Sequence, residues 1–205
     1  MAKNIKLKSQ KSEEYLDDFL TFHNEIDGAM REQHNRSLPF NEEFTDRWDR
    51  AKKLGFGEGT SIYDNSYVYG EPKIGAKCWI GPQTVIDGSG ELAIGNGCTI
   101  SVGVQIYSHD NVLQTISAGI ESIAHAKTTI GNHVYIGPNA VVTKGSNIGN
   151  RCVVGAFTMI KGDIPDNSVV LGTPGRIVGT VLFEDGKPII KYLKYDKTNL
   201  EVIHS

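Results

Sequence analysis

Three histidines lie close together in the second half of the chain: His109, His125 and His133. An imidazole has an ordinary pKa of about 6.5, so near neutral pH it is largely unprotonated and can take a proton from an attacking hydroxyl group. His109 stands in the segment YSHDN, at the start of a stretch, residues 107–129, that interrupts a regular repeat. Its residue type suits a general base, whereas a lone histidine at a loop is by itself an ordinary surface residue.

The interrupted pattern is a six-residue repeat of aliphatic residues, with one two-residue slip at DGSGEL. Its members are Ile62, Val68, Ile74, Ile80, Ile86, Ile94, Ile100, Ile106, Ile130, Ile136, Val142, Ile148, Val154 and Ile160. Four residues after most of them comes a small residue or a modest aliphatic one: Ser66, Cys78, Thr84, Cys98, Val104, Val134, Ala140, Ser146, Cys152 and Thr158. A helix has a period of about 3.6 residues and cannot hold this repeat, whereas β-branched residues favour strands. The sequence therefore predicts a parallel β-helix whose coils cover one another.

Composition narrows the classes of function. A net charge of −3 and a pI near 6.1 do not favour a nucleic-acid partner. No apolar run approaches the roughly 20 residues that span a bilayer, so we expect no membrane insertion and a cytoplasmic protein. The three cysteines form no CxxC motif and all occupy the small inward position of the repeat, which predicts packing residues rather than nucleophiles or metal ligands.

The flanks of the repeat differ from it. Residues 1–60 read as a helical segment, with one helix expected over about 12–31 and a second that begins at Asn41 as N-cap and ends before Gly55. This segment is expected to cover one end of the solenoid, with acceptor recognition as the alternative role. Residues 61–178 are expected to form the β-helix, and residues 179–205 a tail with a hairpin around EDGK.

The run TTIGNHVYIGPNAVVTKGSNIGNRCVVGAFTMIKGDIPDNSVVLGTPGRIV resembles the hexapeptide-repeat acyltransferases. More narrowly, it is similar to the branch of galactoside, maltose and polysaccharide O-acetyltransferases. The resemblance covers about residues 60–180. It implies a left-handed parallel β-helix with three hexads per coil, a homotrimer, and acetyl-CoA as the acyl donor.

Two interpretations of residues 107–129 compete. The 24 residues from Ile106 to Ile130 would allow the coils to run straight on, with Val112, Ala118 and Ala124 in the aliphatic positions. That arrangement would put Asp110 in the inward position, where an unpaired charge is costly, so an excursion loop is favoured. In the resembled family a loop leaves the coil near this place, with the catalytic histidine at its base, and His109 matches that position.

The resemblance implies transfer of acetyl to a saccharide hydroxyl by direct attack, with His109 as general base. No cysteine or serine has the setting of a nucleophile, so no acyl-enzyme is required. Three alternatives stay open: N-acetylation of a nucleotide-linked amino sugar, a zinc enzyme similar to carbonic anhydrase, and a purely structural solenoid. The zinc alternative is the more remote, since the spacing of the histidines departs from that family's ligand pattern and its His-Gly-Cys stretch is absent.

The donor site also follows from the resemblance. Ala156 in VGAF matches the small residue that lines the pantetheine groove, and Arg176 in TPGR matches the basic residue that reaches CoA phosphate, both across a subunit boundary. Lys161 is a third donor-site candidate. It aligns with the threonine before the family's lysine, and Gly162 takes the place of that lysine.

The acceptor side is expected to include two residues. Tyr135 in NHVYIG stands where sugar O-acetyltransferases often carry Trp, and His125 lies near the far end of the interruption. The expected acceptor is a polysaccharide precursor or a nucleotide-linked sugar. His133 falls at a corner of its hexad and is expected to be a surface residue, and no metal is expected at the site.

Overall fold

The computed structural model describes residues 6–195 and 202–203, and the chain divides into two compact units, residues 1–45 and 46–205. Part of the expected C-terminal tail, residues 196–201 and 204–205, lies outside the described residues. Among the described residues, no helix combines the length and the apolar character that crossing a membrane requires.

The first unit is helical, as expected. Helix α1 (Gln10–His34) begins at Ser9, whose side chain accepts a hydrogen bond from the Ser12 amide, and ends at Asn35 in the left-handed conformation. The short helix α2 (Phe40–Glu43) follows. His23 Nε2 lies 2.8 Å from Glu43 Oε2, and aromatic rings from both helices meet around this pair.

The expectation of one helix beginning at Asn41 is wrong. The chain forms α2 and then a separate helix α3 (Arg47–Lys53). The physical reason is the side chain of Asp46, which accepts hydrogen bonds from the amides of Trp48 and Asp49, both at 2.9 Å, and so begins a new helix.

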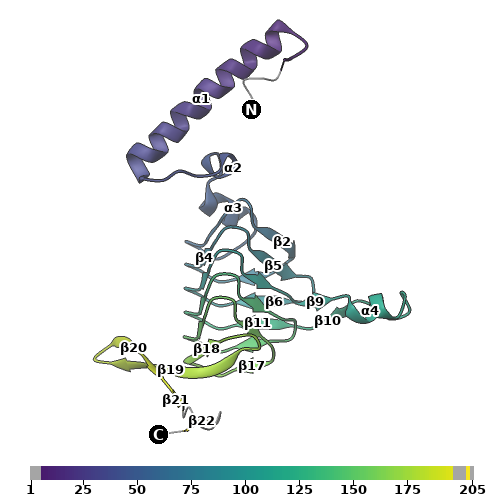
Figure 1. The fold of residues 1–205 in the computed structure, drawn as a ribbon, viewed down its shortest axis with the longest axis vertical. Helices are drawn as coiled ribbons and strands as arrows, with labels where there is room; N and C mark the ends of the chain where they lie inside the picture. Colours follow the sequence, from purple (N-terminus) through teal and green to yellow (C-terminus); the bar gives the residue numbers. More distant parts are fainter. Residues whose placement is uncertain (1–5, 196–201, 204–205) are drawn as a thin grey trace. The chain divides into compact units, whose positions relative to one another are not determined.

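The second unit is a left-handed parallel β-helix of three sheets, which confirms the predicted fold class. Its coils stack one above another (Figure 1). The first sheet joins β1 (Ser61–Ile62), β4 (Trp79–Ile80), β7 (Thr99–Ile100), β12 (Tyr135–Ile136), β15 (Val153–Val154) and β18 (Ser168–Leu171). The second joins β2 (Tyr67–Gly70), β5 (Val85–Gly88), β8 (Gln105–Ile106), β13 (Val141–Val142) and β16 (Met159–Ile160). The third joins β3 (Lys73–Ile74), β6 (Leu92–Ile94), β11 (Thr128–Ile130), β14 (Asn147–Ile148) and β17 (Asp163–Ile164). We call these sheets A, B and C.

The core consists of the two inward positions that the repeat predicts. Aliphatic side chains sit on aliphatic side chains of the next coil, as Ile136 sits between Ile100 and Val154. Except for Val68, which is partly buried, every aliphatic of the repeat is buried, and so is every residue of the small position. The three cysteines belong to this second set, and each Sγ lies 3.1 Å from a carbonyl oxygen of the following coil.

Glycine follows many of the aliphatics because the coils approach closely at the corners. A Cβ added to Gly137 would lie 2.7 Å from the Ala156 nitrogen on the next coil. The left-handed conformation falls elsewhere, on residues such as His133 (φ 58°) and Arg151 (φ 55°). The missing side chain therefore serves the contact between coils rather than the backbone turn.

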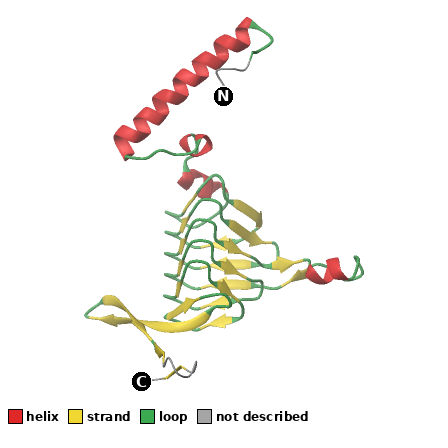
Figure 2. Cartoon of the chain, viewed as in Figure 1, coloured by secondary structure: helices red, strands yellow, loops and turns green. Residues whose placement is uncertain are grey.

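Both ends of the β-helix are covered from within the second unit. At the first coil, Ala51 of α3 and Phe56 join the core, and the Arg50 guanidinium donates to the carbonyls of Tyr63 and Ser66. At the last coil, β18 pairs antiparallel with β19 (Arg176–Glu184), which forms a hairpin with β20 (Lys187–Tyr192), shown as strands in Figure 2. The predicted C-terminal hairpin is thus confirmed. A last pair follows, β21 (Lys194–Tyr195) and β22 (Val202–Ile203).

We expect Ile136→Ala to lower the free energy of unfolding by roughly 2–5 kcal/mol, because Ile136 is fully buried and its truncation leaves a cavity between two coils. Thr99→Ala, at a partly exposed position of the neighbouring coil, should cost less than about 1 kcal/mol. Denaturant unfolding of both variants measures the difference. Equal losses would contradict the role assigned to the aliphatic stack.

Candidate active site

The repeat is interrupted by an arm that leaves the stack and returns to it. After β8 the chain forms β9 (His109–Asp110), helix α4 (Val112–Ile116) and β10 (Ala124–His125), and β9 pairs antiparallel with β10. The arm closes at its base, where the Ala126 amide donates to the Ser108 carbonyl at 2.9 Å and Thr128 Oγ1 donates to the Tyr107 carbonyl at 2.8 Å. Figure 1 shows it projecting from the coils. It is a paired ribbon with a short helix rather than an irregular loop.

His109 is held at the base of this arm by a buried carboxylate. Its Nδ1 lies 2.6 Å from Asp87 Oδ2, and its backbone amide donates to the same oxygen at 3.1 Å. The side chain of Asp87 is fully buried, whereas that of His109 is 33% exposed. With Nδ1–H donating to Asp87, the imidazole is oriented and its Nε2 is left to accept a proton.

Asp87 stays ionised because several donors converge on it. Burial of the carboxyl favours its neutral form, but hydrogen bonds from Ser108, Ser89 and His109 outweigh that effect and hold the pKa of Asp87 at about 2. The amides of Ser108 and Ser89 donate to it at 2.8 and 3.0 Å. The site therefore contains a fixed negative charge at the Nδ1 edge of the imidazole.

The two-residue slip in the repeat makes room for this pair. It widens the turn after β5, so that Gly90 lies against the next coil and its amide donates to Ser108 Oγ at 2.8 Å. A Cβ on Gly90 would lie 2.1 Å from the Ser108 carbonyl oxygen. Asp87 lies in β5, just before this turn, and the sequence did not lead us to predict its role. Its signal was an acid directly after Ile86, where seven other aliphatics of the repeat are followed by glycine.

A cavity of about 390 Å³ opens beside His109. It is lined by Tyr107, His109, Asp110, Asn111, Ile123, Thr143 and Lys144. Lys144 Nζ lies 3.3 Å from Asp110 Oδ2 and ties the next coil to the arm. Burial and the charge of Asp87 raise the pKa of Tyr107, so its hydroxyl stays protonated and donates to Gln105 Oε1 at 2.7 Å.

His125, the residue near the far end of the interruption, lies beside His109. The two residues are register partners in β9 and β10, and their rings are stacked with centroids 5.8 Å apart. His125 is exposed and faces outward from the base of the arm. The structure therefore brings the two imidazoles together at the base of the arm.

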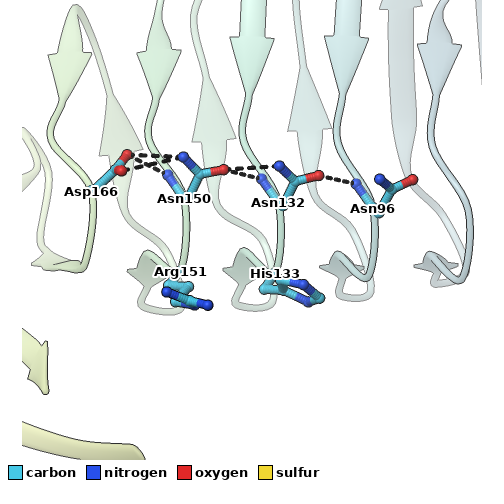
Figure 3. A pocket seen from close by; sticks show the side chains of 6 residues that line it. All are labelled: Asn96, Asn132, His133, Asn150, Arg151 and Asp166. Atoms are coloured by element: carbon cyan, nitrogen blue, oxygen red, sulfur yellow. Dashed lines mark hydrogen bonds between the residues drawn. The ribbon is translucent and has the colours of Figure 1, made fainter. Parts of the chain in front are cut away.

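His133 lies at a different corner of the coil. It follows sheet C, whereas His109 follows sheet B. Figure 3 shows it next to Arg151 beside a row of amide side chains, in which Asn132 and Asn150 each receive a hydrogen bond from the backbone of the preceding coil. This row borders a second cavity, of about 410 Å³. The three histidines thus do not converge, and among residues 6–195 no three His, Cys, Asp or Glu side chains are grouped as metal ligands.

The donor-site candidates lie on the later coils. Ala156 is exposed at the corner between sheets A and B. The loop before Arg176 folds onto the same corner, since Thr173 Oγ1 donates to the Phe157 carbonyl at 2.6 Å and the Gly175 amide donates to the Met159 carbonyl at 2.8 Å. The structure therefore brings Ala156 and Arg176 to one corner.

Lys161 and Tyr135 lie apart from that corner. Lys161 directly follows β16 and is exposed. It lies at the same corner of the coils as Tyr107, the residue at the base of the arm, because both directly follow aliphatics that are stacked in sheet B. Tyr135 points outward from sheet A, between Thr99 and Val153 of the adjacent coils, and its side chain is 43% exposed. Within one chain it does not line the cavity beside His109.

Comparisons with known proteins agree with this architecture. The family described as "Bacterial transferase hexapeptide (six repeats)" matches residues 127–162. Nodulation protein L of Rhizobium meliloti is 31% identical over 159 residues, which cover 74% of this chain and 84% of that protein. Galactoside O-acetyltransferase of Escherichia coli is 25% identical over 147 residues, 61% of this chain and 71% of that enzyme. The chain spans less than half the length of several further relatives.

Among solved structures, AntD, an N-acyltransferase from Bacillus cereus crystallised with dTDP and 3-hydroxybutyryl-CoA, superposes with a TM-score of 0.53 at 22% identity. The superposition covers 66% of this chain and 90% of that one, and it shows a shared fold. Because the match to nodulation protein L extends over most of both chains, and the family's repeat matches residues 127–162, the chain belongs to the bacterial hexapeptide-repeat transferase family.

Proposed function

We propose that the protein transfers an acetyl group from acetyl-CoA to a hydroxyl group of a saccharide. The observation that carries this proposal is the Asp87–His109 pair, with Nδ1 and Oδ2 2.6 Å apart, at the base of an arm and beside a cavity. In a histidine oriented in this way, Nδ1 is held by its hydrogen bond and Nε2 can accept a proton, as a general base requires.

The chemistry needs one proton carrier. As the acceptor oxygen attacks the thioester carbonyl, His109 Nε2 takes the hydroxyl proton, and the buried charge of Asp87 stabilises the imidazolium that forms. The tetrahedral intermediate then collapses, the carbon–sulfur bond breaks, and Nε2–H returns the proton to the departing thiolate. Atoms and charges balance without an acyl-enzyme, and the buried cysteines have no part in the reaction.

The donor is proposed to bind between protomers. Ala156 and Arg176 lie at the corner between sheets A and B, whereas His109 lies at the corner between sheets B and C. One chain therefore does not bring both sets of residues to one place. In a homotrimer, the Ala156–Arg176 corner of one protomer would face the His109 corner of the next, with Lys161 beside it, and the guanidinium of Arg176 suits a CoA phosphate.

The acceptor group is proposed to be a hydroxyl of a saccharide or a nucleotide-linked sugar, with His125 and Tyr135 contributing to its binding. Paired acceptors that differ only in one group, such as a nucleoside-diphosphate hexose and its 2-amino derivative, test this with release of free CoA thiol as the readout. Turnover of the amino sugar alone would replace the proposal by N-acetylation. Failure of acetyl-CoA to raise the melting temperature would contradict the transferase proposal itself.

We expect His109→Ala to lower kcat by about 100-fold or more, because the general base is lost, while acetyl-CoA affinity stays unchanged. The matched control is His133→Ala, which removes an exposed imidazole at another corner of the coil and should leave kcat within about two-fold of the parent. Steady-state kinetics and calorimetric titration of acetyl-CoA measure both effects. An active His109→Ala protein would remove the assignment.

We also expect the charge of Asp87 to make the free energy of unfolding depend on pH. Its pKa of about 2 in the folded state lies below the ordinary value of 3.8, so ionised Asp87 stabilises the fold above about pH 4, and this contribution is lost as the pH falls toward 2. It amounts to roughly 2 kcal/mol. Asp87→Asn has no such titration.

Urea unfolding of the parent protein and Asp87→Asn at pH 7 and near pH 2.5 measures this contribution. The advantage of the parent over the variant should be larger at pH 7 than at the acid pH. The same difference at both pH values would show that the carboxylate is not held ionised by the fold.

A further inference from the structure

A column of side chains runs along the corner that carries His109. Each member directly follows the last aliphatic of a sheet-B strand, and these aliphatics are register partners on successive coils. From the first coil to the last, the column is Tyr69, Asp87, Tyr107, Thr143 and Lys161. The Asp87–His109 pair therefore has tyrosines on the coils at both sides of its carboxylate.

The first coil presents an aromatic surface next to this column. Tyr67 and Tyr69 project from the same side of β2, 61% and 49% exposed, with ring centroids 6.4 Å apart and planes within 17° of each other. Tyr69 is the register partner of Asp87. Two parallel, solvent-exposed rings, one of them on the register partner of Asp87, form a stacking surface for another ring.

The spacing of coils fixes how far this surface lies from the reaction centre. Tyr69 and Tyr107 are two coils apart, and neighbouring parallel strands are about 4.8 Å apart, so the separation along the column is about 10 Å. Tyr107 lines the cavity together with His109. A single pyranose ring held at His109 does not extend over that distance, whereas a ligand with a second ring does.

The column also has a direction. The proposed donor residues Ala156, Lys161 and Arg176 all belong to coils after His109, while Tyr67 and Tyr69 belong to the first coil. Acceptor and thioester must meet at His109, so an acceptor that approaches from the side opposite to the donor passes over the tyrosines.

We propose that Tyr67 and Tyr69 hold the second ring of an acceptor that contains at least two rings, while its first ring, which carries the acetylated group, lies at Tyr107 and His109. The second ring is a sugar or a nucleobase, since both stack on aromatic side chains. This inference rests on the proposed function and names its substrate class. It excludes free monosaccharides as the preferred acceptors.

The test compares acceptors that share the same hexose. Glucose, galactose, mannose and their 2-amino derivatives are each supplied as free sugar, as disaccharide and as nucleoside-diphosphate sugar, and kcat/KM is measured from thiol release. We expect one two-ring form to exceed its free sugar by about ten-fold or more. The disaccharide and nucleotide arms show which ring Tyr67 and Tyr69 hold.

Substitutions of Tyr67 and Tyr69 then test whether these two rings cause the preference for two-ring acceptors. The double variant Tyr67→Ala/Tyr69→Ala should raise KM for the two-ring acceptor by about ten-fold and erase the preference, with the free sugar and acetyl-CoA affinity unaffected. Tyr67→Phe/Tyr69→Phe keeps both rings and should keep the preference. Tyr192→Ala, which removes an exposed tyrosine from the C-terminal hairpin, is the matched control and should behave as the parent.

Three outcomes would overturn the inference. Equal kcat/KM for free and two-ring acceptors contradicts it, and so does an unchanged preference in the double alanine variant. Both leave the proposed acetyl transfer standing. Turnover of no member of the panel by protein that binds acetyl-CoA contradicts the saccharide acceptor and this inference together.

Discussion

The contact of each coil with the next is the constraint on which the rest of the molecule depends. Parallel strands of adjacent coils are hydrogen-bonded in register, so an aliphatic side chain always meets another aliphatic side chain, as at Ile100, Ile136 and Val154. Each coil buries its inner surface only with a neighbour on both sides. That requirement explains the closed ends, where Ala51 and Phe56 cover the first coil and β19 lies along the last. It also explains the absence of side chains at corners such as Gly137, where the next backbone comes too close for a Cβ.

Within this regular frame, one buried charge departs from the rule that the interior is apolar. Asp87 is fully buried, yet it is held by the amides of Ser89, Ser108 and His109 and by the imidazole. A carboxylate satisfied in this way can stay ionised inside a protein. The widened turn at Gly90 supplies the space, and the arm supplies the imidazole. The irregular features of the sequence, the slip and the interruption, therefore meet at one point.

The regular part of the molecule could be predicted from the sequence, because the position of a residue in the hexad decides its environment. The aliphatic and small positions, the buried cysteines and the C-terminal hairpin follow from local pattern. Asp87 could not be placed in the same way, since its role depends on a residue 22 positions later that the coil brings alongside. The division between α2 and α3 was missed because Asn41 and Asp46 are both good caps, and the actual bonds to Trp48 and Asp49 decide between them.

The hydrogen bonds at the base of the arm affect which parts of the sequence can change without disturbing the coils. The Ala126 amide donates a hydrogen bond to the Ser108 carbonyl, and Thr128 Oγ1 donates one to the Tyr107 carbonyl. These hydrogen bonds join the two ends of the arm to each other at the surface of the stack. The residues beyond that junction do not take part in the pairing of β6 with β11, and these two strands are paired in regular register. Insertions, deletions and exchanges in residues 112–123 can therefore accumulate while the scaffold and its imidazole stay in place. Such a segment is free to change faster than the coils that carry it, and new ligand preferences can be acquired there without rebuilding the protein.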